Sequence, residues 1–479
     1  MGQTAGSGNT EVFRMAEVRL TRRELLQGAV ASAGLAVASP LRAGSAPETA
    51  RKFRVALPQE ILPLPEGVSK YRTAPGFKWR GIKGWGWTAA QYLEEIPVMA
   101  DYKMNFLMNC YTSMWETGDR WIWRERKNVN HWYEPLPEEK KLAYERVVQA
   151  CRRQGIEFCF SMNPILFSDR PFDYDDSQAF QALWRHYAWM QGLGARWFNV
   201  SLDDIVQGID AAGQAKLVNE VMLRLRAKDP AAQMIFCPTW YAGPDGGASE
   251  SSPRMGTGDT PGVRYTKELA DGLNREVYLF WTGPEVCSLT ITKEAAQTYK
   301  TLARRRLFIW DNYPVNDQQP TLHLGPVMGR DPRLMHVADG FISNPLSPEN
   351  QANRIPMLTI ADYTWNPEAY DPARSIGQSI AHLGRTPEER LALKDLVELY
   401  PGRLVDGSLS SGWNSFRNQF RLTLDSGSRE AAKDFIAQAE GVSQRMMKLY
   451  PEQFVEARKI LDADIDEIRT EYSRKYSSK

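Results

Sequence analysis

The sequence lacks the features that mark metal, redox and dinucleotide-binding proteins. Its five cysteines show no Cys-x-x-Cys spacing, its five histidines form no His-Glu-x-x-His motif, and no Gly-x-Gly-x-x-Gly loop follows a predicted strand. These absences argue against a structural zinc site, a zinc-hydrolase site and a Rossmann-type nucleotide site. We therefore expect neither a metal nor a cofactor.

Excess charge and long apolar runs are also missing. The 59 Lys and Arg residues nearly cancel the 58 Asp and Glu residues, so net charge does not favour nucleic acid or an anionic membrane. No apolar run is long enough for a stable transmembrane helix, and we expect no membrane insertion of the mature chain. Neutral substrates fit this balance. The 15 Trp residues could stack on sugar rings, although filling a core is their commoner use.

The N-terminus has the order of an export signal. Paired arginines, Arg22 and Arg23, precede a weakly apolar stretch from Gly28 to Ala38 and then small residues near Ala43. This order resembles a twin-arginine signal, so we expect residues 1–46 to direct export to the periplasm or beyond, with an extended linker over 47–77. An amphipathic N-terminal helix is the alternative.

Strand-like and helix-like segments alternate through the middle of the chain. Helical periodicity separates eight short apolar runs typical of buried parallel strands. The eight runs are Arg80–Trp87, Phe106–Tyr111, Glu157–Asn163, Trp197–Asp204, Met234–Tyr241, Glu276–Thr282, Leu307–Tyr313 and Gly340–Asn344. This rhythm predicts an α/β fold, a (β/α)8 TIM barrel over residues 78–367, with an open doubly wound sheet as the alternative.

Beyond residue 367 the strand-like runs stop. Amphipathic helices are expected over Arg385–Tyr400, Ser428–Tyr450 and Pro451–Tyr472, the first with a capping signal at Thr386. Residues 368–479 therefore form a predicted helical C-terminal region. It could pack on the barrel, mediate dimerisation or extend a substrate groove.

Polar residues gather where the predicted strands end, which is the catalytic face of such a barrel. Asp203 and Asp204 end the fourth run, and the later runs end in polar side chains. These are Thr239, Tyr241, Thr282, Asp311, Asn312, Asp317 and Asn344. Neighbouring residues on a regular strand face opposite ways, but this alternation is lost where a strand ends, and a turn there can aim both acids at the barrel axis. The alternative is that Asp204 merely caps the next segment.

An adjacent acid pair suits one glycosidase mechanism in particular. Enzymes with a carboxylate nucleophile place their two acids on opposite sides of the scissile bond. If the substrate's own 2-acetamido oxygen attacks C1, one acid can orient the acetamido group while the other protonates the leaving oxygen. Crowding of like charges raises one pKa, as a general acid requires.

The order of motifs resembles glycoside hydrolase family 84, the β-N-acetylglucosaminidase and O-GlcNAcase family. The matching motifs are Leu202-Asp203-Asp204-Ile205, Cys237-Pro238-Thr239-Trp240-Tyr241, Trp281-Thr282-Gly283-Pro284, Trp310-Asp311-Asn312-Tyr313-Pro314-Val315-Asn316-Asp317, Leu324-Gly325-Pro326, Ser343-Asn344-Pro345 and Ala361-Asp362-Tyr363-Thr364-Trp365-Asn366-Pro367. Their spacing, one per strand end, makes the match specific.

The resemblance implies a role for each matching residue. Asp203 would orient the acetamido group and stabilise an oxazoline, and Asp204 would be the general acid and base. The implied sugar-binding residues are Tyr241 near the acetamido or scissile oxygen, Trp310 and Asn312 at the acetamide, Asp317 at O4 and O6, Asn344 at another hydroxyl, and Gly84 on the first strand.

Two positions depart from the family pattern. The first strand of the family usually ends Glu-Gly-Phe-Tyr-Gly, whereas this chain has Lys83-Gly84-Trp85-Gly86-Trp87. A family lysine past the second strand corresponds here to Thr112. These changes affect contacts to O3 and O4, and so leave gluco or galacto preference open.

The sequence therefore predicts a retaining β-N-acetylhexosaminidase acting on a glycan or glycoconjugate with a 2-acetamido sugar. Two alternatives remain, a catalytically silent carbohydrate-binding barrel and an endo-acting hyaluronidase-type glycosidase. Intact Asp203 and Asp204 argue against the silent barrel, since binding alone does not call for two crowded acids.

Overall fold

The computed structural model describes residues 74–111, 114–115, 130–243, 258–316, 321–347, 350–406 and 413–476. The predicted export signal, most of the linker, Thr112 and Asp317 lie outside these ranges, so those assignments stay predictions. Within the described ranges, no helix has both the length and the apolar character needed to cross a bilayer.

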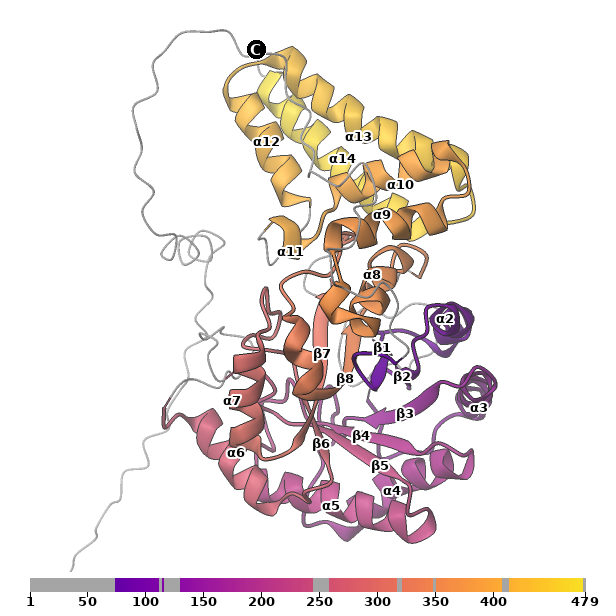
Figure 1. Ribbon diagram of the computed structural model, residues 1–479, viewed down its shortest axis with the longest axis vertical. Coiled ribbons are helices and arrows are strands. Elements are labelled where there is room, and N and C mark those ends of the chain that lie inside the picture. Colours follow the sequence, from indigo (N-terminus) through magenta and orange to yellow (C-terminus); the bar gives the residue numbers. More distant parts are fainter. Residues whose placement is uncertain are drawn as a thin grey trace, which may run out of the picture. The chain divides into compact units, whose positions relative to one another are not determined.

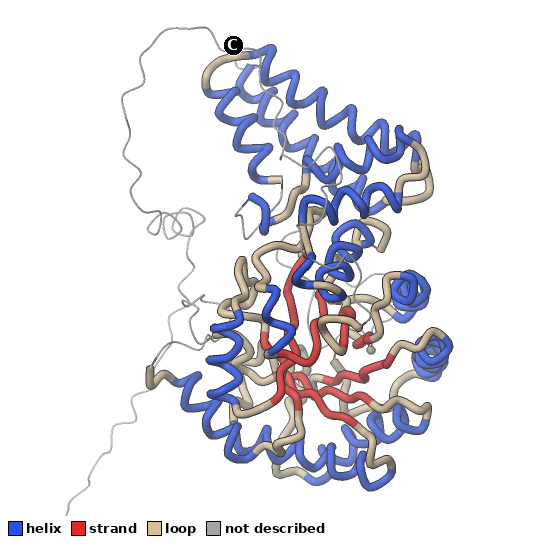
Figure 2. Tube along the Cα trace, in the orientation of Figure 1, coloured by secondary structure: helices blue, strands red, loops and turns tan. Residues whose placement is uncertain are grey.

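Eight parallel strands form a closed barrel in the order β1 to β8, which confirms the predicted (β/α)8 fold (Figures 1 and 2). The barrel closes where β1 pairs with β8, with Trp79 opposite Gly340. The strands are β1 (Trp79–Lys83), β2 (Phe106–Met108), β3 (Glu157–Met162), β4 (Trp197–Ser201), β5 (Gln233–Cys237), β6 (Tyr278–Trp281), β7 (Arg306–Pro314) and β8 (Ala338–Asn344).

Aromatic rings close the barrel at the end where its strands begin. Trp197, the first residue of β4, packs edge-on against Phe106 of β2 and Phe308 of β7, at ring-centroid distances of 5.2 and 5.6 Å. Trp79 and Tyr278, which begin β1 and β6, join the same group. Because this end is filled, a substrate can reach the barrel interior only where the strands end.

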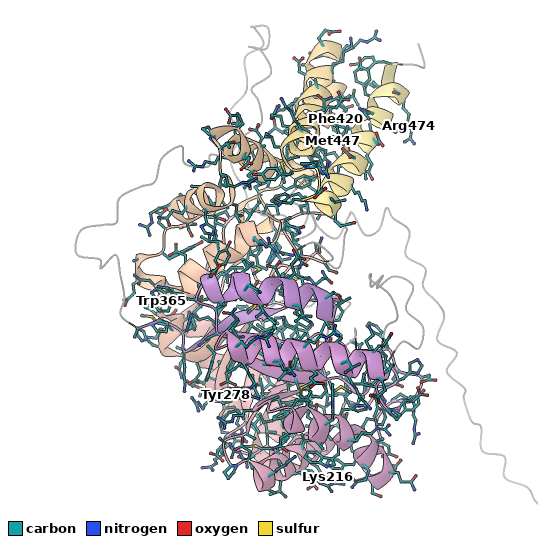
Figure 3. The ribbon with its side chains drawn as sticks, turned by 90° about the vertical axis from the view of Figure 1, so that its right-hand side faces the viewer. Lys216, Tyr278, Trp365, Phe420, Met447 and Arg474 are labelled. Carbon is teal, nitrogen blue, oxygen red and sulfur yellow. The ribbon has the colours of Figure 1, made fainter. Side chains whose placement is uncertain are left out.

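Helices surround the barrel and several begin at a side-chain cap. Thr88, Thr260 and Thr292 each accept a hydrogen bond from a backbone amide in the first turn. The helices are α2 (Ala89–Asp101), α3 (Glu138–Arg153), α4 (Ser177–Gly192), α5 (Ala211–Lys228), α6 (Pro261–Gly272), α7 (Lys293–Ala303) and α8 (Arg354–Trp365). Trp365 at the end of α8 (Figure 3) lies 5.2 Å from the Arg80 guanidinium, a contact that ties α8 to β1.

Helices also make up the described C-terminal residues, as predicted. They are α9 (Pro372–Leu383), α10 (Pro387–Leu399), α11 (Arg403–Asp406), α12 (Asn414–Asp425), α13 (Arg429–Leu449) and α14 (Val455–Tyr476), preceded by a 3-10 turn, Pro367–Ala369. Thr386 caps α10 by accepting from the Glu389 amide, which confirms that capping signal. Helices α9, α10, α12, α13 and α14 share one hydrophobic cluster with Leu322, Leu324, Leu346 and Ile355 from the barrel's own loops and α8.

Candidate active site

The two adjacent acids follow β4 at a sharp change of backbone direction. Leu202 still donates its amide hydrogen to the Cys237 carbonyl at 2.8 Å, as if the ladder continued. Asp204 then adopts the left-handed conformation, with φ of +56°. Asp tolerates this region better than most residues, although it costs free energy. This turn ends the strand alternation, and both acids line one cavity.

Asp203 occupies the buried side of that cavity. It is only 5% exposed, and the Tyr111 hydroxyl donates to its Oδ2 at 2.5 Å. Among the described residues, no hydrogen-bond donor reaches its Oδ1. A buried carboxylate oxygen without a donor is costly unless a ligand supplies one.

Opposing influences set the pKa of Asp203. Burial raises the pKa of this carboxyl, and the nearby Asp204 carboxylate raises it further. The Lys83 ammonium and the Tyr111 hydrogen bond act in the other direction. The pair therefore retains one proton to a higher pH than two exposed aspartates would.

Asp204 occupies the open side. Its side chain is exposed to solvent, and its Oδ1 accepts a hydrogen bond from the Tyr241 hydroxyl at 2.7 Å. This contact turns the carboxylate toward the cavity. Access to water and a fixed orientation are what a proton-exchanging acid and base needs.

The cavity brings together six of the eight predicted site residues. Asp203 and Asp204 share it with Tyr241, Trp310, Asn312 and Asn344. The other lining residues are Trp85, Cys237, Thr282, Val286, Cys287 and Val315. The acids therefore face a wall of aromatic, amide and small apolar side chains.

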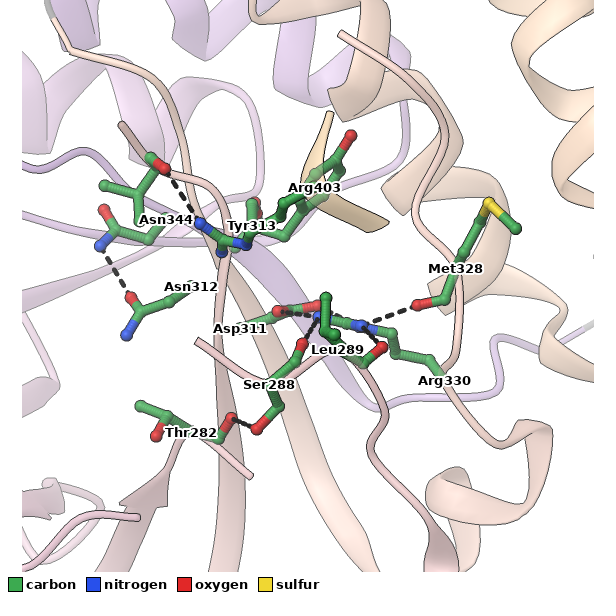
Figure 4. Close-up of polar contacts among 12 residues, drawn as sticks. Thr282, Ser288, Leu289, Asp311, Asn312, Tyr313, Met328, Arg330, Asn344 and Arg403 are labelled. Carbon is green, nitrogen blue, oxygen red and sulfur yellow. Dashed lines mark hydrogen bonds and ion pairs between the residues drawn. The ribbon is translucent and has the colours of Figure 1, made fainter. Parts of the chain in front are cut away.

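A chain of amide hydrogen bonds fixes one side of this wall. Asn344 accepts from the Trp85 amide at 3.1 Å and donates to Asn312 Oδ1 at 2.9 Å. Asn312 in turn donates to the Val286 carbonyl at 2.8 Å. Figure 4 shows the contact between the two asparagines. The loops after β1 and β6 are thereby tied to the C-terminal ends of β7 and β8 around the cavity.

A buried ion pair supports the same wall from behind. Arg330 makes two hydrogen bonds to Asp311, at 2.7 and 2.5 Å, and both side chains are almost completely buried. The guanidinium also donates to the carbonyls of Ser288 and Leu289, in the loop that carries Cys287 (Figure 4). Asp311 therefore points away from the cavity and positions the loop after β6.

Three residues singled out at strand ends do not line the cavity. Besides Asp311, Thr239 lies behind the cavity, where Gln214 donates to its hydroxyl. The Gly84 carbonyl already accepts from the Tyr92 hydroxyl and the Trp87 amide. Both its lone-pair directions are occupied, and Trp85 presents the wall in its place. The eighth predicted site residue, Asp317, lies outside the described residues.

Sequence reasoning missed Tyr111 and Lys83, which act on Asp203 directly. Tyr111 ends the second apolar run and reads there as one more buried aromatic residue. Lys83 offers a clearer signal, because a lysine at the end of an apolar strand must have its charge compensated. Within the described ranges, no cluster of three His, Cys, Asp or Glu side chains is arranged to hold a metal ion.

Comparison with known proteins agrees with this geometry. A β-N-acetylglucosaminidase (NAGidase) family model matches residues 81–398. Two proteins named Protein O-GlcNAcase, from rat and mouse, are 27% and 26% identical to this chain over 297 and 296 residues. The matched segment covers 60% of this chain but only 29% of each relative. The chain thus spans less than a third of those relatives.

Among solved structures, a mutant of the Thermobaculum terrenum O-GlcNAc hydrolase shares the fold. Its TM-score is 0.66 at 22% identity, covering 83% of this chain and 84% of the other. The family match covers well over half of the chain; it begins at the third residue of β1 and extends through the other seven strands. The chain belongs to the β-N-acetylglucosaminidase family, glycoside hydrolase family 84.

Proposed function

We propose that the protein is a retaining β-N-acetylhexosaminidase that hydrolyses terminal 2-acetamido-2-deoxy sugars through an oxazoline. The observation that carries the proposal is the placement of Asp203 and Asp204 on one cavity, with Asp203 Oδ1 buried and lacking a donor among the described residues. The N–H of a substrate acetamido group would supply such a donor.

In the first step the acetamido oxygen attacks C1 and the bond from C1 to the leaving oxygen breaks. Asp204 gives its proton to that oxygen, so the aglycone departs as a neutral alcohol. Asp203 accepts a hydrogen bond from the acetamido N–H, and its negative charge offsets the positive charge of the oxazolinium ion. Trp310 and Asn312 line the cavity where the acetamide would be enclosed.

In the second step water attacks C1 and opens the ring of the intermediate. Asp204 removes a proton from the water and returns to its starting state. Two inversions at C1 give net retention of the β configuration. Because Asp204 is exposed and hydrogen-bonded to Tyr241, it can exchange protons with solvent without losing its orientation.

Three assays test the proposal. Aryl β-N-acetylglucosaminide and β-N-acetylgalactosaminide should be hydrolysed, and Asp204→Asn should reduce kcat/KM by about 10²–10⁴-fold. A thiazoline that mimics the cyclised intermediate should inhibit. Failure to cleave any 2-acetamido glycoside would overturn the hydrolase assignment. Equal cleavage of substrates without the acetamido group would overturn only the oxazoline pathway.

We also propose that the protein is exported, on the strength of the paired arginines near the N-terminus. Replacing both Arg22 and Arg23 with lysine should keep the full-length chain in the cytoplasm when cell fractions are compared. Unchanged export of this variant would contradict a twin-arginine route.

A further inference from the structure

Lys83 is a fully buried lysine at the end of β1. Its ammonium lies 4.2 Å from the ring centroid of Trp85, 4.4 Å from that of Trp310 and 5.0 Å from that of Tyr111. Trp85 and Trp310 line the catalytic cavity, whereas Lys83 does not. The charge therefore lies directly behind the aromatic wall of the site, where ring faces partly replace water.

The ammonium also lies within electrostatic reach of groups from several other strands. It lowers the pKa of Asp203 after β4 and that of the Cys237 thiol at the end of β5, both of which burial raises. Tyr111, whose ring contacts Lys83, is itself hydrogen-bonded to Asp203. The titratable groups around Lys83 and Asp203 are Tyr111 and Cys110 after β2, Asp203 and Asp204 after β4, and Cys237 on β5.

Burying an ammonium costs free energy, and an apolar side chain would fill the end of a barrel strand at lower cost. What a lysine adds is a fixed positive charge against the ring of Tyr111, whose hydroxyl is hydrogen-bonded to the buried Asp203. Because the surroundings are aromatic and dry, that charge is screened far less than one at the surface would be.

We propose that Lys83 is a positioning residue that acts through Asp203, holding its carboxylate ionised so that it can accept the acetamido N–H and offset the oxazolinium charge. This inference rests on the proposed function.

The test compares the pH dependence of kcat/KM for the wild type, Lys83→Met and Lys83→Arg. Methionine keeps the length and removes the charge, whereas arginine keeps the charge. For Lys83→Met we expect the acidic limb to move up by about one pH unit and kcat/KM at pH 5, below the limb, to fall by about tenfold. Lys83→Arg should leave the acidic limb close to that of the wild type.

Circular dichroism and thermal unfolding establish that each variant is folded, and Lys83→Gln replaces the methionine variant if that one does not fold. A folded, active neutral variant with an unshifted acidic limb would overturn the role of Lys83. An equal shift of the acidic limb in Lys83→Arg would also overturn it, because the shift would then follow from the changed shape of the side chain and not from the lost charge. If the wild type itself cleaves no 2-acetamido glycoside, the proposed function fails first, and the two failures are thus distinguished.

Discussion

At the residue scale, each acid of the catalytic pair is hydrogen-bonded by a different tyrosine. Tyr111 donates to Asp203 and Tyr241 donates to Asp204. Each bond favours the ionised form of its partner, so the removal of either raises the pKa of one particular acid. The two tyrosines thus offer a way to assign the limbs of the pH profile.

Tyr111→Phe should raise the acidic limb of kcat/KM by about one pH unit, equivalent to about 1.4 kcal/mol, and so lower activity about tenfold at pH values below the limb. The reason is that Asp203 loses the donor to its Oδ2 and ionises less readily. Tyr241→Phe is the matched comparison and should move the alkaline limb, which reports the protonated Asp204. The assignment of roles is wrong if Tyr111→Phe moves the alkaline limb instead.

Asp203 should also destabilise the folded protein at neutral pH. Burial raises its pKa in the folded state, whereas the unfolded chain ionises normally near pH 4. The native state is therefore penalised as the pH rises from about 4 through the folded-state pKa, and the penalty persists above it.

It follows that Asp203→Asn should be more stable than the wild type at pH 8, by about 1–2 kcal/mol, and equally stable near pH 4. Urea unfolding at both pH values measures this difference. Asp204→Asn is the comparison: it removes only the second cause of the raised Asp203 pKa and leaves burial in place, so its stabilisation at pH 8 should be smaller. A variant Asp203→Asn that is less stable at pH 8 would contradict the argument.

The chemistry-bearing residues were predictable from the sequence because their types are unusual at strand ends. Asp203, Asp204, Asn312 and Asn344 are polar residues that follow buried runs, and the structure gathers them around one cavity. Tyr111 was not predictable, since its aromatic ring fits a buried role equally well and only its hydroxyl contact distinguishes it.

At the element scale, the predicted strands were correct in number and order, but the first six were too long at their C-terminal ends; the seventh stops one residue short of the end of β7, and the eighth ends with β8 at Asn344. The second run was taken to Tyr111, the fourth to Asp204 and the fifth to Tyr241, while β2, β4 and β5 end at Met108, Ser201 and Cys237. Buried aromatic and apolar residues continue past each strand because they form the walls of the site. An apolar pattern in the sequence indicates which residues are buried, and it does not indicate which residues pair with a neighbouring strand. Past the strand ends the residues are still buried although the pairing has stopped.

The loop after β6 depends on Arg330, which donates to its carbonyls while pairing with Asp311. Arg330→Gln should destabilise the protein by about 3–5 kcal/mol, because the Asp311 carboxylate would remain buried without its partner. Asp311→Asn in the same chain should recover part of that loss, since the uncompensated charge is gone.

Thermal unfolding of the two single variants and the double variant gives the coupling energy. Arg330→Gln should also raise KM, because the loop after β6 is displaced. This rise should persist in the double variant, because Asn at position 311 cannot restore the hydrogen bonds that Arg330 donates to the Ser288 and Leu289 carbonyls. Additive losses would show that the two side chains contribute independently, contrary to the buried pair seen here.

At the scale of the whole molecule, the C-terminal helical region makes hydrogen bonds to barrel loops at the active-site end. Arg403 of α11 donates to the Val315 carbonyl at 3.2 Å, and Val315 lines the cavity. Leu324 donates its amide hydrogen to the Tyr400 carbonyl at 2.9 Å. The helical region therefore supports the loop after β7, a role that sequence pattern could not distinguish from plain packing.

The predicted boundary at residue 367 should consequently not separate two independent folding units. Removal of residues 368–479 would expose Leu322, Leu324, Leu346 and Ile355, all fully buried now. At about 1.5–3 kcal/mol each, their exposure removes about 6–12 kcal/mol, which is as large as the whole stability of a typical domain. We expect the shortened chain to aggregate, and the full chain to unfold in one calorimetric transition.

A shortened chain that also carries Leu322→Ser and Leu324→Ser separates two causes of aggregation. If exposed apolar surface alone is responsible, this chain should be soluble and should regain cooperative unfolding. Because the Arg403 contact to Val315 is lost in either case, we expect its kcat/KM to stay well below that of the full chain. Full activity in a soluble barrel that ends at residue 367 would show that the helices contribute nothing to the site.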